Sequence, residues 1–481
     1  MAVKIYNTLH NRKEEFVPIE PGKVKMYVCG PTTYNYIHLG NARPIVAFDV
    51  MRRYFSYRGY DVTYVQNFTD VDDKIINRAQ EEKLDPKELA EKYIAAYFED
   101  AGRLGVKAAD YHPRVTGHMD DIIKMVQGII DNGLAYEANG DVYYEVRKFK
   151  DYGKLSGRSL DEMQAGARIA VGEQKRDPLD FALWKAAKPG EPAWDSPWGQ
   201  GRPGWHIECS AMSSKYLGKT FDIHGGGADL IFPHHENEIA QSEGCNGCQS
   251  VNYWVHNGFI TINSEKMSKS LGNFFLLRDI LDKFPGPVVR FYLMSTHYRS
   301  PLDFDDQKLA AAEKSLARIW NTHRNVAEKI DLLDKNSNLD HDGAAAVKLP
   351  AAVVQTRDKF IAAMDDDFNT SLALAAIFDL CREVNSLLNT ADFQGGPDTV
   401  KALQEVLDFF AELNEVMNVL VPEDGDKDDL SDELLNIIMA IRTKARAAKD
   451  WATADYIRDE LKAIGIAIED TPNGPRWKKE N

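Results

Sequence analysis

The sequence has little cysteine and no long hydrophobic run. Five of its 481 residues are cysteine, too few for a disulfide scaffold, and without an export signal we expect reduced thiols. No apolar stretch approaches the roughly 18 residues of a membrane span, and the opening residues, MAVKIYNTLHNRKEEF, lack an apolar signal core. We therefore expect a cytoplasmic protein without membrane contact, built from several domains.

The sequence has fewer basic residues than acidic ones. The 58 Lys and Arg residues against 74 Asp and Glu give a net charge of -16, which by itself argues against a nucleic-acid partner. The charge is uneven, because residues 423–433 hold seven acids and one lysine, whereas residues 442–481 hold nine basic and seven acidic residues. The sequence predicts a solvated acidic linker and a mildly basic tail, and composition leaves the partner open.

Strand and helix patterns at the start of the chain are typical of a nucleotide-binding sheet. Residues 23–29 and 61–68 read as strands, and the apolar spacing from Ala47 to Tyr54 between them is helical. Strand, helix and strand in this order form a parallel βαβ unit. Strand patterns return at 220–224 and 251–255.

The patterns divide the chain into three expected parts. These are a Rossmann-type core over 1–305 with an insertion at about 110–210, a helical bundle over 306–422, and a linker with a C-terminal domain over 423–481. Within the insertion, residues 186–204 hold four prolines and four glycines, which predicts an ordered loop or lid. Helical periodicity predicts the bundle from the windows 306–333, 350–366, 369–389 and 398–420. The expected fold class is α/β, with a Rossmann-type parallel sheet, an insertion, an α-helical bundle and a small C-terminal domain.

Two short motifs are suited to phosphate chemistry. Residues 266–270, KMSKS, place two lysines in a short loop that can neutralise charge on a leaving pyrophosphate. All five letters match a loop of class I aminoacyl-tRNA synthetases. His38-Leu-Gly-Asn41 resembles the HIGH motif of the same class, in which an imidazole and a helix N-terminus meet ATP phosphates. Gly40 permits close approach of the nucleotide. Asn41 replaces the second histidine, so it can donate a hydrogen bond but carries no charge.

Metal chemistry is indicated around FPHHENE, residues 232–238. His234 and Glu238 are one helical turn apart and are competent zinc ligands. His235 is expected to face elsewhere, either packing or supporting the metal ligands from behind. Cys29, at the end of the first strand, and Cys209, at the start of a helix, can either complete this site or be buried thiols.

A second thiol pair competes for the metal. Cys245 and Cys248 form a CxxC motif that can also bind zinc, or can simply be exposed loop thiols.

Three further stretches have two interpretations each. The acids of residues 67–74 can hold magnesium or cap a helix, and Thr69 can contact substrate. The glycine run within 221–229 can admit adenosine or form a turn. Trp205 and His206, together with His224 and His256, can form the floor of a site or pack in the core.

In combination these motifs resemble the cysteinyl-tRNA synthetase family. The resemblance spans essentially the whole chain, including the tail from Arg442 and the segment EDTPNGPRW. It implies zinc held by Cys29, Cys209, His234 and Glu238, and catalytic roles for His38, Asn41, Lys266 and Lys269. It also implies ATP contacts from His38, Gly40 and Lys269, substrate contacts from Thr69, Trp205, His224 and Asp229, and tRNA contacts from Arg442, Arg446, Trp451 and Trp477.

The resemblance implies a two-step reaction. Cysteine would be activated by ATP with Mg²⁺ to cysteinyl-adenylate and then transferred to the 3′ end of tRNA(Cys), by a monomer. Zinc would bind the substrate thiol and discriminate against serine, so that no editing domain is needed.

Two rivals share parts of the pattern. A ligase that joins cysteine to an amino sugar would lack the long C-terminal region, and a non-catalytic zinc-dependent RNA-binding protein would not need intact KMSKS and HxGN motifs.

Overall fold

The computed structural model describes residues 2–166, 174–262, 265–266, 274–335, 342–390, 393, 395–422, 429–471 and 474–479. Within these residues, no helix is both long enough and apolar enough to cross a bilayer.

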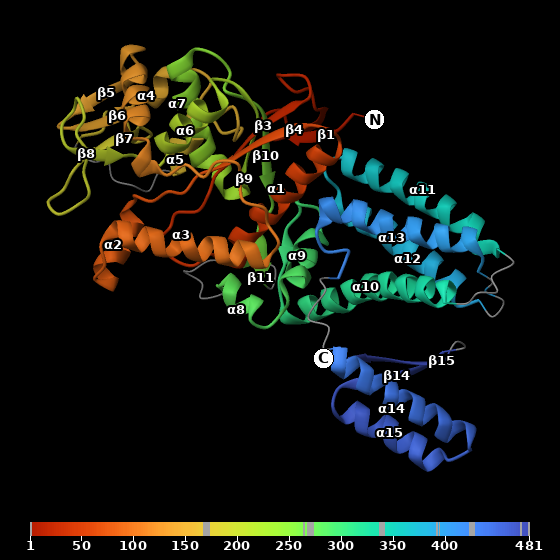
Figure 1. The fold of residues 1–481 in the computed structure, drawn as a ribbon. Helices are drawn as coiled ribbons and strands as arrows, with labels where there is room; N and C mark the ends of the chain where they lie inside the picture. Colours follow the sequence, from red (N-terminus) through yellow and green to blue (C-terminus); the bar gives the residue numbers. More distant parts are fainter. Residues whose placement is uncertain are drawn as a thin grey trace. The chain divides into compact units, whose positions relative to one another are not determined.

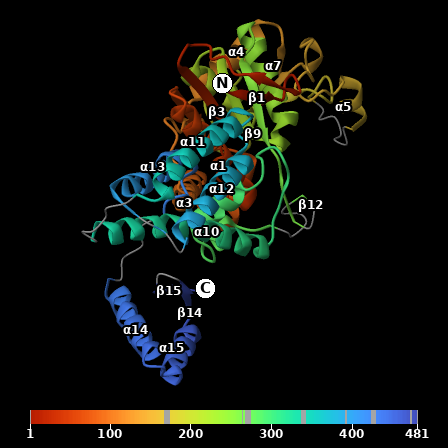
Figure 2. The ribbon, with the colours of Figure 1, turned by 90° about the vertical axis from the view of Figure 1, so that its right-hand side faces the viewer.

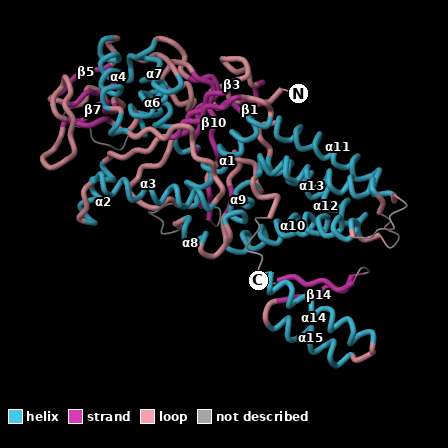
Figure 3. Tube along the Cα trace, viewed as in Figure 1, coloured by secondary structure: helices cyan, strands magenta, loops and turns pink. Residues whose placement is uncertain are grey.

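A four-stranded parallel sheet forms the core. Its spatial order is β10-β9-β3-β4, and the strands are β3 (Lys23–Val28), β4 (Asp61–Gln66), β9 (Phe221–Gly227) and β10 (Val251–Asn257). Figure 3 shows these strands gathered in one layer, with helices around them. Helix α1 (Leu39–Tyr57) is the crossover from β3 to β4. The four strands expected from the sequence are all present, and the predicted α/β fold class is confirmed.

The glycine run lies inside a strand, so its interpretation as a turn is wrong. β9 continues through Gly227 and pairs with β10, with Gly225 opposite Val255. A Cβ added at Gly225 would lie 2.3 Å from Phe48 Cε1, and one at Gly226 would lie 2.8 Å from His235 Cε1. Glycine is needed here because aromatic side chains press directly on the backbone.

The insertion between β4 and β9 contains its own antiparallel sheet, in the order β5-β6-β7-β8. Its strands are β5 (Ala135–Ala138), β6 (Asp141–Tyr144), β7 (Phe181–Ala186) and β8 (Gly201–Pro203). The helices of this stretch are α2 (Asp73–Glu82), α3 (Pro86–Arg103), α4 (Met119–Asp131), α5 (Leu160–Gly166) and α6 (Ile207–Leu217). Helices α4 and α6 pack together with α7 (Glu236–Asn246) beside this sheet (Figure 1).

The expectation of a loop throughout 186–204 is wrong at its end. Gly201–Pro203 form strand β8, in which Pro203 pairs with Trp184. A Cβ at Gly201 would lie 2.3 Å from Trp184 Nε1, so the glycine lets this edge strand pack against a buried tryptophan.

Short elements complete the first part of the chain. They are β1 (Lys4–Asn7), β2 (Arg12–Glu15), β11 (Ile260–Ile262), β12 (Glu265–Lys266), α8 (Leu277–Leu281), α9 (Gly286–Met294) and β13 (Leu302–Asp303).

The second part is helical, as its periodicity predicts. The helices are α10 (Asp306–Asp334), α11 (Ala344–Asp365), α12 (Thr370–Leu388) and α13 (Pro397–Met417). Contacts within the chain group residues 1–319, 354–379 and 411–420 into one compact unit, and 320–353, 380–410 and 421–481 into another. The domain boundaries expected from the sequence stay a prediction.

The C-terminal residues form two helices and a hairpin. These are α14 (Asp429–Ala447), α15 (Trp451–Ala463), β14 (Ile466–Thr471) and β15 (Gly474–Lys479). Helices α14 and α15 lie side by side, and β14 packs on α15 (Figure 2). Leu435, Leu461 and Ile466 form their small core.

The glycine in β9 gives a stability prediction. We expect Gly225→Ala to lower the free energy of unfolding by about 1–3 kcal/mol, because the buried Phe48 ring has no room to move. Gly102→Ala in α3 is the matched control. A Cβ there meets no atom within 4 Å, and the change should stabilise by about 0.5–1 kcal/mol. Urea unfolding followed by tryptophan fluorescence measures both, and equal midpoints for the two variants would contradict this account.

Candidate active site and metal centre

Four side chains from different elements converge at the carboxyl edge of the parallel sheet. Cys29 directly follows β3, Cys209 lies in the first turn of α6, and Glu238 lies in the first turn of α7. His234 belongs to the π-helical turn Ile231–His235 that precedes α7. One donor atom from each of the four lies within 4.8 Å of the other three. The structure thus brings together all four residues that the resemblance assigned to zinc.

The spacing of these donors fits a tetrahedral metal. The two sulfur atoms, Cys29 Sγ and Cys209 Sγ, are 3.8 Å apart. Glu238 Oε1 lies 3.5 Å from Cys29 Sγ and 3.0 Å from His234 Nε2. In a tetrahedral zinc site with Zn–S bonds of about 2.3 Å, two sulfurs are about 3.8 Å apart. Two thiols, an imidazole and a carboxylate are also donor types that zinc prefers.

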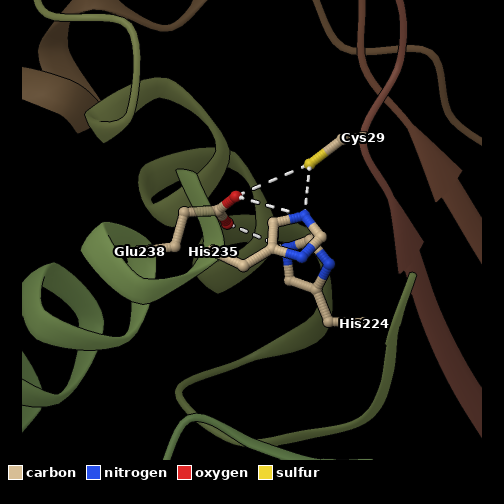
Figure 4. Close-up of side chains that lie close together, drawn as sticks. All are labelled: Cys29, His224, His235 and Glu238. Atoms are coloured by element: carbon tan, nitrogen blue, oxygen red, sulfur yellow. Dashed lines mark hydrogen bonds and ion pairs between the residues drawn. The ribbon is translucent and has the colours of Figure 1, made fainter. Parts of the chain in front are cut away.

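A second set of donors overlaps the first. Cys29, His224, His235 and Glu238 also lie within 4.8 Å of one another, as Figure 4 shows. His235 Nε2 is 3.3 Å from Cys29 Sγ, so the expectation that His235 faces elsewhere is wrong. Residues three and four positions before Glu238 share its helical face, so His235 Nε2 and His234 Nε2 both approach Glu238 Oε1, at 3.9 and 3.0 Å.

Other imidazoles and an indole support the cluster. His206 Nδ1 lies 2.8 Å from His234 Nδ1, and His235 Nδ1 lies 2.7 Å from His256 Nε2. His224 stacks on Trp254 with a ring-centroid distance of 4.6 Å. Trp205, which is 40% exposed, places its ring 4.7 Å from that of His234. The histidines and Trp205 therefore surround the cluster.

Burial and neighbouring charges shift the pKa values of the donors. Burial would raise the pKa of Glu238, but His224 and His234 beside it outweigh burial and lower it to about 2. The hydrogen bond from Cys29 lowers the pKa of Cys209 to about 6, although burial opposes this. Burial raises the pKa of Cys29 well above its usual value. The pocket thus favours a carboxylate at Glu238 and a thiolate at Cys209, which are the forms that bind a cation.

The start of α1 forms the second part of the site. His38 is the N-cap, and its Nδ1 accepts a hydrogen bond from the Asn41 backbone N–H at 3.2 Å. The Asn41 side-chain oxygen accepts the His38 backbone N–H at 3.2 Å, so the two residues cap each other. With Nδ1 accepting, a neutral His38 carries its proton on Nε2. Gly40 lies in the first helical turn between them.

The segment that follows KMSKS lies against this helix start. Leu39 N–H donates to the Phe275 carbonyl at 3.2 Å, and Leu277 N–H donates to the Ile37 carbonyl at 3.0 Å. The ring centroids of His38 and Phe274 are 4.9 Å apart. Lys266 lies in β12 and pairs with Thr261 of β11. Lys269 lies outside the described residues.

The remaining substrate candidates are less close together. The Thr69 hydroxyl is buried and donates to Glu208 Oε2 at 2.8 Å. Asp229 is exposed at the end of β9. In the stretch 67–74, Asp72 caps α2 by accepting the Lys74 backbone N–H at 2.9 Å, which agrees with the helix-cap interpretation.

Sequence reasoning did not single out Asn67. Its side chain is buried, its Oδ1 accepts the Gly30 backbone N–H at 3.0 Å, and the same oxygen lies 3.8 Å from Cys209 Sγ. The sequence feature that could have indicated a role for Asn67 in the site is its position directly after β4.

The C-terminal candidates for tRNA contact divide into two groups. Arg442 is buried, at 4% exposed, and the tRNA contact expected of it stays a prediction. Trp477 is half-buried and packs on the small core. Arg446 and Trp451 are exposed. Cys245 and Cys248 belong to no cluster of metal-ligand type among the described residues.

Comparisons with known proteins agree with this geometry. Residues 15–314 match the family described as "tRNA synthetases class I (C) catalytic domain", residues 359–421 match the "DALR domain", and residues 427–477 match the "Cysteinyl-tRNA ligase anticodon binding domain". The structure is similar to that of Mycobacterium tuberculosis methionyl-tRNA synthetase in complex with methionyl-adenylate. The TM-score is 0.65 at 15% identity, covering 82% of this chain and 92% of that one. The fold, together with the match to the catalytic-domain family, identifies the chain as a class I aminoacyl-tRNA synthetase.

Relatives that match over the whole length of the chain identify the family within this class. The chain is 60% identical to the cysteine–tRNA ligase of Pelotomaculum thermopropionicum, covering 99% of this chain and all of the relative. It is 52% identical to that of Thermococcus onnurineus, covering 100% of this chain and 99% of the relative. The chain belongs to the cysteine–tRNA ligase family, which confirms the resemblance drawn from its motifs.

The mutual cap at His38 and Asn41 gives a second stability prediction. Asn41→Ala removes one of the two reciprocal hydrogen bonds and should lower the free energy of unfolding by about 1 kcal/mol. Asn41→Asp keeps an oxygen acceptor near the positive end of the helix and should retain the stability. Urea unfolding compares the two, and equal losses would show that the side-chain oxygen is not the stabilising group.

Proposed function

We propose that this chain activates L-cysteine with ATP and Mg²⁺ and transfers it to the 3′ end of tRNA(Cys), in the cytoplasm and as a monomer. Zinc, held by Cys29, Cys209, His234 and Glu238, would supply a soft Lewis acid that binds the substrate thiol and discriminates against the alcohol of serine. The observation that carries the proposal is the convergence of these four donors at one edge of the sheet that also holds His38 at a helix N-terminus.

Two observations favour this donor set over the overlapping one. It contains two thiols rather than one, and zinc prefers thiolates. His234 also contacts His206 through Nδ1, which leaves its Nε2 for a metal, an arrangement common among histidine ligands. In the other set, the His224 ring stacks on Trp254, which suits a supporting role.

The chain's own residues would serve the first step as follows. The cysteine carboxylate attacks the α-phosphorus of ATP, and pyrophosphate leaves with its electron pair. His38 Nε2–H donates to a phosphate oxygen, and the N-terminus of α1 adds partial positive charge. Lys266 and Lys269 neutralise the charge that passes to pyrophosphate.

In the second step, a ribose hydroxyl of the terminal tRNA nucleotide attacks the carbonyl of cysteinyl-adenylate and AMP leaves. Trp205 and Thr69 would border the bound amino acid, with Thr69 oriented by its hydrogen bond to Glu208. His224 and Asp229 are further candidates for substrate contact.

Transfer of labelled cysteine to tRNA tests the function as a whole. We expect acid-precipitable label that depends on ATP and Mg²⁺. The preference for cysteine over serine in ATP–pyrophosphate exchange should exceed the roughly 10–200-fold that a metal-free pocket supplies for one small group. Exchange without label on tRNA would indicate another acceptor, and the absence of both signals would refute the proposal.

Zinc binding separates the two donor sets. We expect Cys209→Ser to lose zinc on dialysis against a weak chelator. His224→Asn should lower the zinc affinity by about 10–100-fold and still bind one zinc per chain at saturation. Mass spectrometry of bound metal and competition with a coloured chelator measure both variants. Retention by Cys209→Ser with loss in His224→Asn would assign the metal to the other set.

A further inference from the structure

Helix α8 begins at the segment that meets His38. Leu276, the N-cap of α8, forms a backbone bridge with His38, and the centroid of the Phe274 ring lies 4.9 Å from that of the His38 ring. The helix itself packs against α3 (Figure 1). Because residues 274–276 come shortly after the KMSKS motif, the position of α8 determines where this stretch meets the start of α1.

The side chain of Arg278, the second residue of α8, joins three parts of this region. Its guanidinium carbon Cζ lies 3.7 Å from the centroid of the Tyr36 ring, which is a stacking distance. Its Nη2 donates to Asp100 Oδ1 of α3 at 3.1 Å. Glu99 Oε2 lies 3.6 Å from the same nitrogen, but the Glu99 side chain is 67% exposed, so solvent weakens this contact. One half-buried guanidinium therefore connects α8, α3 and the residue two positions before His38.

Asp100 depends on Arg278 as its counter-charge. The Asp100 side chain is 1% exposed, and its second oxygen, Oδ2, has no hydrogen-bond partner among the residues that the structure describes. Burial raises the pKa of Asp100, and the Arg278 guanidinium opposes this shift. Because a buried carboxylate without a counter-charge is costly, Asp100 keeps the guanidinium in place over Tyr36.

Tyr36 has a second contact on α3. Its ring meets the Tyr93 ring edge to face, with centroids 5.2 Å apart and an interplanar angle of 88°. The carbonyl of the next residue, Ile37, accepts the Leu277 backbone N–H at 3.0 Å. The two residues directly before His38 are thus fixed to both α3 and α8.

The orientation of His38 leaves one ring nitrogen for a ligand. Nδ1 accepts the Asn41 backbone N–H, so Nε2 is the nitrogen that can donate to a phosphate. The direction of this N–H depends on the backbone that leads into His38, and a displacement of about 1 Å at a reacting group can cost about 100-fold in rate. The contacts of Arg278 therefore bear on the chemical step through Tyr36.

We propose that Arg278 is a positioning residue for the formation of cysteinyl-adenylate. Paired with Asp100 and stacked on Tyr36, it keeps His38 aligned with the stretch that follows the KMSKS motif. The proposal rests on the proposed function and extends it to a side chain outside the motifs and the metal cluster, which acts through Tyr36 and not on the substrates.

The test measures the two reaction steps separately in the full chain. Arg278→Ala should lower the single-turnover rate of cysteinyl-adenylate formation by about 10–100-fold, because His38 loses its alignment with the phosphates. The KM for cysteine should be unchanged, since cysteine binds at the metal cluster. The rate of transfer from preformed cysteinyl-adenylate to tRNA should also be unchanged, since pyrophosphate has already left.

The matched control is Arg103→Ala. Arg103 also joins α3 to α8, because its Nη1 lies 3.0 Å from Asp282 Oδ1 and its Nη2 donates to the Leu281 carbonyl, but it stacks on no ring among the described residues. We expect Arg103→Ala to lower the urea midpoint of unfolding and to keep the rate of adenylate formation.

A second variant reaches the same contact from its other side. Tyr36→Leu removes the aromatic face but leaves the pair of Arg278 and Asp100 intact, so the chain should fold and adenylate formation should fall as in Arg278→Ala. Because both changes break one contact, the double variant should show no further loss.

Four results would overturn the positioning role. These are unchanged adenylate formation in Arg278→Ala, an equal fall in Arg103→Ala, additive losses in the double variant, and an equal fall of both reaction steps, which would indicate a general structural defect. Absence of cysteine-dependent ATP–pyrophosphate exchange in the unaltered chain would instead refute the proposed function.

Discussion

The buried carboxylate of Glu238 is the group on which the site depends. It is 2% exposed, and its two oxygens meet His224 at 2.8 Å and His234 at 3.0 Å, with Cys29 Sγ at 3.5 Å. An unpaired buried charge is costly, so the surrounding imidazoles and thiols are needed for the carboxylate to remain ionised. A cation at this point would satisfy the same requirement, and the local electrostatics of the cluster are therefore those of a metal site.

The parallel sheet explains how distant residues reach this carboxylate. The carboxyl ends of parallel strands meet at one edge, and ligand sites gather there. Cys29 and Asn67 follow β3 and β4, and His224 lies in β9 with its backbone paired to Trp254 of β10. Close packing at Gly225 and Gly226 brings Phe48 of α1 and His235 against β9. The helix start that holds His38 and the cluster around Glu238 are thus fixed to one rigid sheet.

Local patterns predicted the core strands, the long helices and the pair His234 and Glu238, whereas Cys29 and Cys209 were added to that pair only by the family resemblance. These patterns did not predict the contacts that depend on packing. The strands of the core, the four long helices and the pair His234 and Glu238 follow from periodicities of two and about 3.6 residues. The strand character of the glycine run depends on Phe48 from a distant helix, whereas the approach of His235 to Glu238 follows from a spacing of three residues that helical periodicity could have predicted. Likewise, the burial of Arg442 depends on tertiary packing, which no single helix pattern reveals.

Ion pairs also join the insertion to the core of the parallel sheet. Asp73 holds Lys185 of β7 and the buried Arg202 of β8, so one residue at the start of α2 ties the insertion to the strand ends of the core. Arg202 also pairs with Glu191 at 3.2 Å, which anchors the segment between β7 and β8. Arg202 is buried, whereas the side chains of Asp73 and Lys185 are 49% and 39% exposed. Arg202 lies three residues before Trp205, whose ring lies against His234 of the cluster, so these ion pairs hold the insertion next to the candidate metal site.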